Sequence, residues 1–446
     1  MEREPIGVLG AGWVGLVTAA SFAALGHRVV VRDVSPERIA ALQEGRVPIH
    51  EPGLAETIAR NRDRLAFTLA VEDVLESARI VFVCVGTPST YSGDADLSAV
   101  WQVVDELAGV TDPLLLVMKS TVPVGTGERV RTRLDERGLE NVGYVANPEF
   151  LSEGTALADF AEPDRVVVGA FDPADAGRVA ALYGHLSAPV LRTDVPSAEM
   201  IKLASNAALM TRISFINEIA NVCELVGADV EEVARGIGLD HRVGPHFLRA
   251  GIGYGGSCFP KDASALKQLA ANSGYHFQLL SAVIDVNELQ RRRVVQKLQA
   301  HLGQLNGRTV ALLGLAFKPG TNDLREAPSL VLAPRLLAEG AAVRAWDPVA
   351  LESARGALPG VELADTILAA VAGADAAVIV TDWPELRDLA SPEVRQAMRT
   401  PLIVDGRNLL DPAEARAAGF AYEGIGRPAA VTEIPDTPEP APGLTS

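Results

Sequence analysis

Short apolar runs alternate with helical patterns along the N-terminal part of the chain. Each run is too short for a helix and is bounded by polar or turn-forming residues, which is typical of a buried strand. Strands that alternate with helices predict a parallel sheet covered by helices on both faces. The expected strands cover residues 5–10, 28–32, 79–85, 114–118, 142–146 and 165–169.

A long helical pattern follows this alternation. From residue 197 to residue 227 the chain has no proline, and Gly227 is the only glycine. Apolar residues such as Met200, Leu203 and Ala207 recur at helical spacing, which predicts one long helix, with further helices up to about residue 302. A long helix between two sheet domains commonly forms a dimer interface; a helix internal to one domain is the alternative.

A second alternation of strand and helix patterns begins at Thr309. Its strands are expected at residues 309–315, 342–345, 376–380 and 402–404. The strand that leads to Asp347 echoes an earlier strand that leads to Asp33. The sequence therefore predicts an α/β fold of two doubly wound, Rossmann-like domains joined by a long central helix.

These patterns divide the chain into four segments. We expect an N-terminal sheet domain over residues 1–196, a helical dimerisation domain over 197–303 and a C-terminal sheet domain over 304–427. Residues 428–446 contain five prolines and several acids, with no lysine or arginine after Arg427. Such a segment cannot bury a core, so a disordered tail is expected there.

The charge balance restricts the possible partners. The chain has 40 lysines and arginines against 57 aspartates and glutamates, a net charge of −17. General nucleic-acid binding needs a surplus of cations and is therefore not expected. Three cysteines at positions 84, 223 and 258 are too few and too far apart for a disulfide framework. They fit a reducing, cytoplasmic location.

Residues 6–27 contain no charged side chain and could span a bilayer by length alone. Five glycines in that stretch, an acidic start and the absence of a basic n-region argue against a membrane helix or signal peptide. We therefore expect no membrane association.

A glycine pattern, Gly10-x-Gly12-x-x-Gly15, follows the first expected strand and opens a helix. Such glycines let the backbone approach a pyrophosphate at a helix N-terminus. Asp33 ends the next strand, where a carboxylate accepts hydrogen bonds from the adenosine ribose and repels a 2′-phosphate. The pattern predicts a dinucleotide site that prefers NAD over NADP; a tight turn without a cofactor is the alternative.

The segment 251–262 carries the second candidate chemistry. Four glycines in six residues suggest a backbone held open for a ligand, and Cys258 follows with Lys261 and Asp262 close behind. Because a nearby cation lowers the pKa of a thiol, Cys258 is a candidate nucleophile. A small buried side chain in a turn is the alternative reading. The seven histidines show no metal-ligand spacing, so no metal is expected.

The chain resembles the nucleotide-sugar dehydrogenases, and most closely those that oxidise UDP-glucose. The resemblance covers roughly residues 5–410. It rests on an ordered set of segments at residues 10–15, 48–54, 85–88, 120–126, 147–154, 163–165, 199–202 with Asn206, 251–262, 317–321 and 405–408.

The resemblance implies a two-step oxidation that uses two molecules of NAD. Asp262, through a water, and Lys202 match the family's residues for removing the alcohol proton. Cys258 would attack the aldehyde, and Lys202 with Asn206 would stabilise the oxyanion of the thiohemiacetal. After a second oxidation, Glu149 would assist hydrolysis of the thioester, with Thr121 positioning the water.

The resemblance also implies binding residues. The expected cofactor contacts are Gly10, Gly12, Val14, Gly15, Asp33, Arg38, Thr87, Thr121, Glu153, Lys261 and Arg325. The expected substrate contacts are Glu149, Phe150, Leu151, Lys202, Asn206, Phe247, Gly251, Gly255, Lys318 and Arg407, with Arg242 reaching into the site of a neighbouring subunit of a homodimer.

Other functions stay open at this point. Phe259 and residues 240–245 favour a UDP-glucose substrate over GDP-mannose or an N-acetylated UDP-sugar. A non-catalytic NAD-binding protein would not need Cys258, Lys202 and Asp262 together. An alcohol dehydrogenase that stops at the aldehyde would not need the cysteine.

Overall fold

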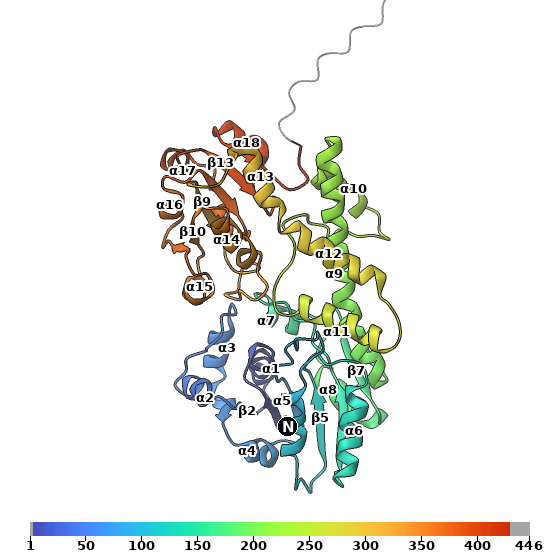
Figure 1. Cartoon of the computed structure of the whole chain (residues 1–446). Coiled ribbons are helices and arrows are strands. Elements are labelled where there is room, and N and C mark those ends of the chain that lie inside the picture. Colours follow the sequence, from blue (N-terminus) through green and yellow to red (C-terminus); the bar gives the residue numbers. More distant parts are fainter. Residues whose placement is uncertain (1–2, 429–446) are drawn as a thin grey trace, which may run out of the picture.

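The computed structural model describes residues 3–428 as two sheet domains, one above the other, with a long helix along the side of both (Figure 1). The two-domain α/β fold predicted from the sequence is confirmed. The tail predicted over residues 428–446 lies, apart from Pro428, outside the described residues. No helix within residues 3–428 is long and apolar enough to cross a membrane.

The N-terminal sheet has the strand order β3-β2-β1-β4-β5-β6-β7-β8. Its strands are β1 (Ile6–Leu9), β2 (Val29–Arg32), β3 (Leu65–Thr68), β4 (Ile80–Val83), β5 (Leu114–Met118), β6 (Val142–Ala146), β7 (Val166–Ala170) and β8 (Val190–Thr193). The prediction of a purely parallel sheet is wrong at β7, which pairs antiparallel to β6. The segment between them contains only the short helix α7 (Ala156–Ala161), which packs on α1 (Trp13–Ala24), and the chain does not cross back under the sheet.

Helices cover both faces of this sheet, and each face has its own apolar core. Phe22 of α1 packs against Phe82 of β4 on one face, and Val100 of α5 joins Leu116 of β5 on the other. The remaining elements are α2 (Pro36–Gln43), α3 (Leu54–Arg60), η1 (Arg62–Arg64), α4 (Val71–Ser77), α5 (Ser98–Glu106), α6 (Thr126–Glu136) and α8 (Pro173–Leu182).

The central helix, α9 (Val195–Val226), is 32 residues long. The Asp194 side chain accepts a hydrogen bond from the Ser197 N–H at its start, and Gly227 ends it with a positive φ of 76°. The helix begins two residues before the boundary expected at residue 197. The other helices of this region are α10 (Val230–Gly238), α11 (Phe259–Asn272), α12 (Gln278–Gln290) and α13 (Arg293–Leu302).

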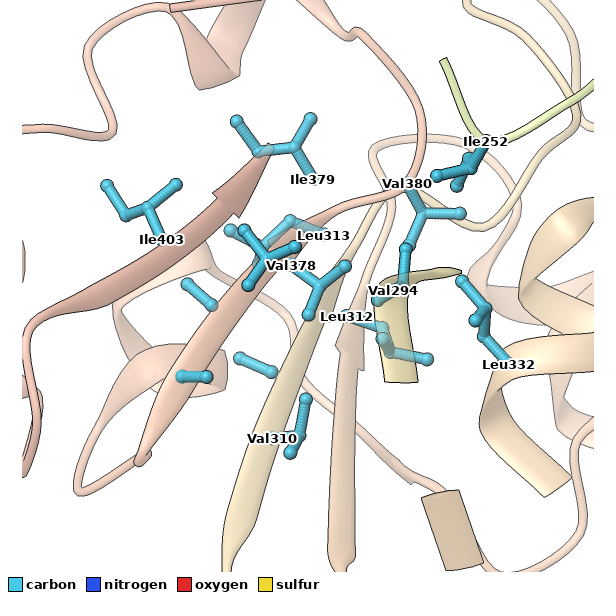
Figure 2. Close-up of a cluster of buried hydrophobic side chains, with 14 of the residues drawn as sticks. Ile252, Val294, Val310, Leu312, Leu313, Leu332, Val378, Ile379, Val380 and Ile403 are labelled. Atoms are coloured by element: carbon cyan, nitrogen blue, oxygen red, sulfur yellow. The ribbon is translucent and has the colours of Figure 1, made fainter. Parts of the chain in front are cut away.

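The C-terminal sheet is parallel throughout, in the order β11-β10-β9-β12-β13-β14. Its strands are β9 (Thr309–Leu313), β10 (Ala342–Trp346), β11 (Glu362–Leu363), β12 (Ala376–Ile379), β13 (Leu402–Asp405) and β14 (Ala421–Glu423). Its short helical elements are α14 (Pro328–Ala338), α15 (Leu351–Ala357), α16 (Ile367–Val371), η2 (Pro384–Leu386), α17 (Pro392–Ala397) and α18 (Pro412–Ala417). Figure 2 shows Leu312 of β9 and Val378 of β12 within the core of this domain, together with Val294 of α13 and Leu332 of α14.

Both sheets therefore reverse their strand order at the first strand, between β1 and β4 and between β9 and β12. Ligands of such sheets bind beyond the carboxyl ends of the strands at this point. The loop after β9 reaches the loop after β6, where Lys318 Nζ donates to Ser152 Oγ at 2.7 Å and Thr321 Oγ1 donates to Glu153 at 3.0 Å. The loops at the carboxyl edges of the two sheets thus contact each other.

Candidate active site

A cleft with a volume of about 1030 Å³ runs along the carboxyl edge of the N-terminal sheet to the start of α11. It brings the glycine pattern and Asp33 into one space with Cys258, which is more than two hundred residues away in the chain. Of the predicted cofactor contacts, all except Gly15 line it: Gly10, Gly12, Val14, Asp33, Arg38, Thr87, Thr121, Glu153, Lys261 and Arg325.

Each of the three positions of the pattern favours glycine for a different structural reason. Gly10 has a φ of 101°, and a Cβ there would lie 2.5 Å from the Cys84 carbonyl oxygen. A Cβ at Gly15 would overlap the Gly10 carbonyl oxygen, so this residue permits α1 to pack on its strand. A Cβ at Gly12 would meet no atom within 4 Å, because Gly12 faces the cleft at the N-terminus of α1. Open space beside an uncapped helix N-terminus fits a pyrophosphate.

Asp33 is buried at the end of β2 and accepts hydrogen bonds from the Ala11 N–H at 2.7 Å and the Ser35 N–H at 3.0 Å. Burial opposes its charge, but these bonds and the Arg38 guanidinium hold the pKa of its carboxyl below the usual range. Arg32, the other cation that could attract a 2′-phosphate, is paired with Glu106 at 2.8 Å. An ionised Asp33 therefore fits the ribose of NAD.

Cys258 occupies the N-cap position of α11 without a capping hydrogen bond from its side chain, and the residue is exposed. We expected the net pKa of this thiol to be lowered by a nearby cation, but in the ligand-free chain it is raised. Lys202 does favour the thiolate, but the desolvation of the sulfur within the cleft and the negative charges of Glu149 and Asp262 outweigh it and raise the pKa of the thiol.

Glu149 and Lys202 form a buried ion pair with 2.8 Å between Oε1 and Nζ. Glu149 follows β6, and its other carboxylate oxygen accepts the Leu151 N–H at 2.6 Å. Burial opposes the charge on both groups. Their mutual attraction, with Asp262 and Cys258 also acting on Lys202, holds the pKa of Glu149 below and the pKa of Lys202 above its usual range. Both groups are therefore ionised.

A second polar pair lies one helical turn further along α9. Asn206 Nδ2 donates to Asp262 at 2.6 Å, and Lys261 Nζ lies 2.6 Å from the other oxygen of the same carboxylate. Because Lys202 and Asn206 are four residues apart, they share one face of α9. That face carries an ammonium and an amide beside the loop of Cys258.

Three further predicted substrate residues, Phe150, Leu151 and Arg407, have different surroundings. The Arg165 guanidinium lies 3.7 Å from the centre of the Phe150 ring, and Lys202 Nζ lies 5.6 Å from it. Arg407 donates to the carbonyl oxygens of Val380 and Gly253, while its Nη2 has no partner among residues 3–428. Leu151 is half-buried beside Glu149.

Within residues 3–428, Glu149 is the one predicted substrate contact that lines the cleft, and two of the others, Arg242 and Phe247, lie on the surface of this single chain. Arg242 is exposed and pairs with Asp240 at 2.6 Å. Phe247 is also exposed, with a φ of 60° that is unusual for a residue other than glycine. Their proposed roles stay predictions.

The glycine segment before Cys258 is packed against protein, which gives its glycines a structural reason, while their expected role toward a ligand stays a prediction. A Cβ at Gly251 would lie 2.9 Å from the Gly406 carbonyl oxygen, and one at Gly255 would overlap the Glu326 carbonyl oxygen. At Gly253 a Cβ would lie 2.6 Å from the Asn287 side chain. The glycines thus let this segment sit between α12 and the C-terminal sheet domain.

Sequence reasoning missed two charged residues of the site. Glu51 accepts hydrogen bonds from Trp13 Nε1 and from the N–H groups of Gly154 and Ala156, and so ties the cofactor loop to the loop of Glu153. Lys119 is buried behind Glu149. Each lies in or beside a segment that carries the family resemblance, which was the available signal. Among residues 3–428 no cluster of side chains could hold a metal ion.

Comparisons with known proteins agree with this geometry. Models of the UDP-glucose/GDP-mannose dehydrogenase family match the chain over residues 4–187 (NAD binding domain), 196–289 (central domain) and 311–412 (UDP binding domain). UDP-glucose 6-dehydrogenase TuaD of Bacillus subtilis is 46% identical over 96% of this chain and 94% of its own length. A UDP-glucose 6-dehydrogenase of Pseudomonas aeruginosa is 47% identical over 95% and 97%.

A solved structure is also similar. A UDP-glucose dehydrogenase from the archaeon Pyrobaculum islandicum superimposes with a TM-score of 0.88 at 38% identity, covering 96% of this chain and 98% of that one. The family models and these identities, together with the cleft that joins a dinucleotide site to Cys258, lead to one conclusion. The chain belongs to the UDP-glucose/GDP-mannose dehydrogenase family and is an NAD-dependent nucleotide-sugar dehydrogenase.

Proposed function

We propose that this protein oxidises UDP-glucose to UDP-glucuronate in two oxidations, through a thiohemiacetal and a thioester on Cys258. The observation that carries the proposal is the position of Cys258. It shares a cleft with the glycine pattern and lies beside the Glu149–Lys202 and Asn206–Asp262 pairs. Bound NAD supplies the hydride acceptor of each oxidation.

In the first oxidation, a base must take the proton of the sugar hydroxyl. Asp262 is buried and held by Asn206 and Lys261, so its carboxylate has a fixed orientation. It accepts the hydroxyl proton through a water molecule. Lys202, whose ammonium is fixed by Glu149, stabilises the negative charge that develops on the oxygen.

The aldehyde has no hydride to give until a nucleophile adds to it. Cys258 Sγ forms a bond to the aldehyde carbon and produces a thiohemiacetal. The ammonium of Lys202 and the amide of Asn206 face the same side from α9 and stabilise its oxyanion. The second oxidation then leaves a thioester on Cys258.

Hydrolysis of the thioester needs a water and a base. Glu149 is ionised and buried, which suits it to accept a proton from the attacking water. Thr121 lines the cleft, its carbonyl oxygen held by Thr87 Oγ1 at 2.8 Å, and its side chain positions that water.

The diphosphate of the substrate binds to cations of the C-terminal domain. Lys318 and Arg407 follow β9 and β13, where the carboxyl edge of this sheet meets the cleft. Arg407 has a free guanidinium nitrogen within the described residues, which fits a phosphate oxygen. A few placed cations thus allow a strongly acidic chain to bind an anionic ligand.

The active form is a homodimer. Phe215, Val222, Leu225 and Val226 of α9 are all exposed, although a single helix face with this many apolar side chains is normally covered. Pairing of this face with a second copy would bury it. Arg242, which is exposed in one chain, reaches the site of the other.

GDP-mannose is the alternative substrate. An assay of NADH formation with UDP-glucose, GDP-mannose and N-acetylated UDP-sugars decides between them. We expect turnover of UDP-glucose at least about a hundredfold more efficient than that of the others, as pockets built around specific polar groups achieve. Turnover of GDP-mannose alone would reassign the substrate and leave the chemistry unchanged.

A further inference from the structure

A second cavity, of about 160 Å³, lies directly behind the candidate active site. We name it the back pocket; its walls include Lys119, Asn147, Glu149, Phe150, Arg165 and Tyr183. The volume has room for several water molecules. Lys119 and Glu149 line both the back pocket and the main cleft. These two side chains therefore separate the reaction space from the back pocket.

Lys119 is an unusual buried lysine. It follows β5, and within residues 3–428 its Nζ donates hydrogen bonds to two neutral oxygens, those of Asn147 at 3.3 Å and Tyr183 at 3.5 Å. Tyr183 in turn donates to Asn147 at 2.7 Å. No carboxylate within residues 3–428 forms an ion pair with it, whereas the other buried active-site lysine, Lys202, has one. Burial without a counter-ion readily lowers the pKa of a lysine, which makes its neutral amine available as a base.

The groups that face Lys119 come from several elements. Cys84, Glu149 and Lys202 interact electrostatically with its amine, and the Tyr183 ring lies against it. Burial lowers the pKa of Lys119 to about 8 with a further contribution from the positive charge of Lys202, and the negative charge of Glu149 opposes this. The neutral amine is therefore accessible close to neutral pH.

The back pocket reaches solvent past exposed acidic side chains. Glu162 and Asp164 lie on its rim and are exposed, and Asp159 is half-exposed. In the proposed reaction the main cleft is occupied by cofactor and sugar when the thioester forms. The back pocket gives a proton released at Glu149 a second route to solvent, apart from the cleft.

We propose that Lys119 carries the proton of thioester hydrolysis from Glu149 to the water of the back pocket. This inference rests on the proposed function. The water oxygen bonds to the acyl carbon, the C–S bond breaks with its electron pair on Cys258 Sγ, and one water proton goes to Glu149. Because Glu149 and Lys119 form no ion pair within residues 3–428, a water of the back pocket takes the proton from Glu149 and gives one to the neutral amine of Lys119, and the ammonium then releases its proton to the pocket. The other water proton leaves the new carboxylic acid and protonates the Cys258 thiolate.

The test separates hydrolysis from oxidation in a single turnover. In Lys119→Ala, both NADH molecules form at rates near those of the wild type, and hydrolysis slows about tenfold or more, so that intact-protein mass spectrometry shows sugar on Cys258. Lys119→Met keeps the buried stem and gives the same result if the alanine variant folds poorly. Lys297→Ala is the matched control. It removes another buried lysine, which is paired with Glu224 and Glu423, and we expect normal hydrolysis of the thioester in this variant.

Chemical rescue distinguishes a proton carrier from a structural role. Methylamine and ethylamine fit the space left in Lys119→Ala and restore hydrolysis, with a rate that depends on the pKa of the amine. Tetramethylammonium has the charge but no proton to transfer and restores nothing. Equal rescue by tetramethylammonium, or normal hydrolysis in both Lys119 variants, overturns the proposal. If the wild type forms no adduct and fewer than two NADH per sugar, the proposed function fails, and the relay fails with it.

Discussion

The Glu149 carboxylate, in the wall of the cleft, and the Lys202 ammonium lie 2.8 Å apart. Both are buried, and they come from a loop and a helix separated by 53 positions in the chain. Each is expected to act on a different step, Lys202 on the oxyanion and Glu149 on the hydrolytic water. Because the pair fixes both charges before substrate binds, removal of either partner leaves the other buried and unpaired.

The roles of Cys258 and Glu149 are separable by substitution. Cys258→Ser keeps the shape, but a hydroxyl is hardly ionised at neutral pH, so we expect turnover to fall about a hundredfold or more. Glu149→Gln slows hydrolysis instead, and sugar accumulates on Cys258, visible by intact-protein mass spectrometry. A Cys258→Ser variant that still makes two NADH per sugar at a normal rate would show that water attacks the aldehyde directly.

The glycines of the cofactor loop give a matched pair. Gly12→Ala adds a methyl group to open space, so we expect an unchanged thermal midpoint and a KM for NAD raised at least about tenfold. Gly15→Ala overlaps the Gly10 carbonyl and destabilises the fold by about 3 kcal/mol or more. Differential scanning fluorimetry and initial rates measure both. An unstable Gly12→Ala with normal NAD binding would contradict this division of roles.

Asp33 predicts the choice of cofactor. Its ionised carboxylate accepts the ribose hydroxyls and repels a 2′-phosphate, and Arg32 is occupied by Glu106. We expect kcat/KM for NAD to exceed that for NADP about a hundredfold or more, and Asp33→Asn to narrow the gap. Equal use of both cofactors by the wild type would refute the role of Asp33.

The reactivity of Cys258 reports the charges around it. Because its pKa is raised in the ligand-free chain, the thiolate fraction is small at neutral pH, and the rate of alkylation by iodoacetamide climbs with pH without levelling off below the ordinary thiol range. Glu149→Gln removes a negative charge and moves the profile to lower pH, and Lys202→Met moves it to higher pH. Cys258→Ala controls for the buried Cys84 and Cys223. Shifts of the pH profile in the opposite directions would contradict the assigned effects of Glu149 and Lys202 on the pKa of Cys258.

The exposed face of α9 predicts the oligomer. Phe215→Glu with Leu225→Glu places charges on that face, and light scattering should then report a monomer with low activity, because Arg242 no longer reaches a partner site. Leu191→Glu, at an exposed apolar position on β8, leaves the dimer intact as a control. A wild-type protein that is monomeric and fully active would contradict the proposal that the active form is a homodimer.

Sequence patterns located the inner strands and missed the outer ones. β3 and β8 of the first sheet and β11 and β14 of the second were not expected, and each is the edge strand of its sheet. An edge strand is covered less completely, so its apolar run is shorter and mixed with polar residues, as Arg192 in β8 illustrates. The reversal of β7 was also missed, since strand direction depends on where the preceding loop packs.

The sequence by itself determined the parts of the site that lie within one local unit. The glycine pattern, the following helix and Asp33 belong to adjacent elements, so spacing alone defines a dinucleotide site. Only the tertiary structure decided which charges meet. Glu149 contacts Lys202, and Asn206 contacts Asp262, because the long helix α9 packs against both the end of β6 and the start of α11. The back pocket beside Lys119 arises in the same way, because β5, β6 and α8 must pack before Lys119, Asn147 and Tyr183 can meet.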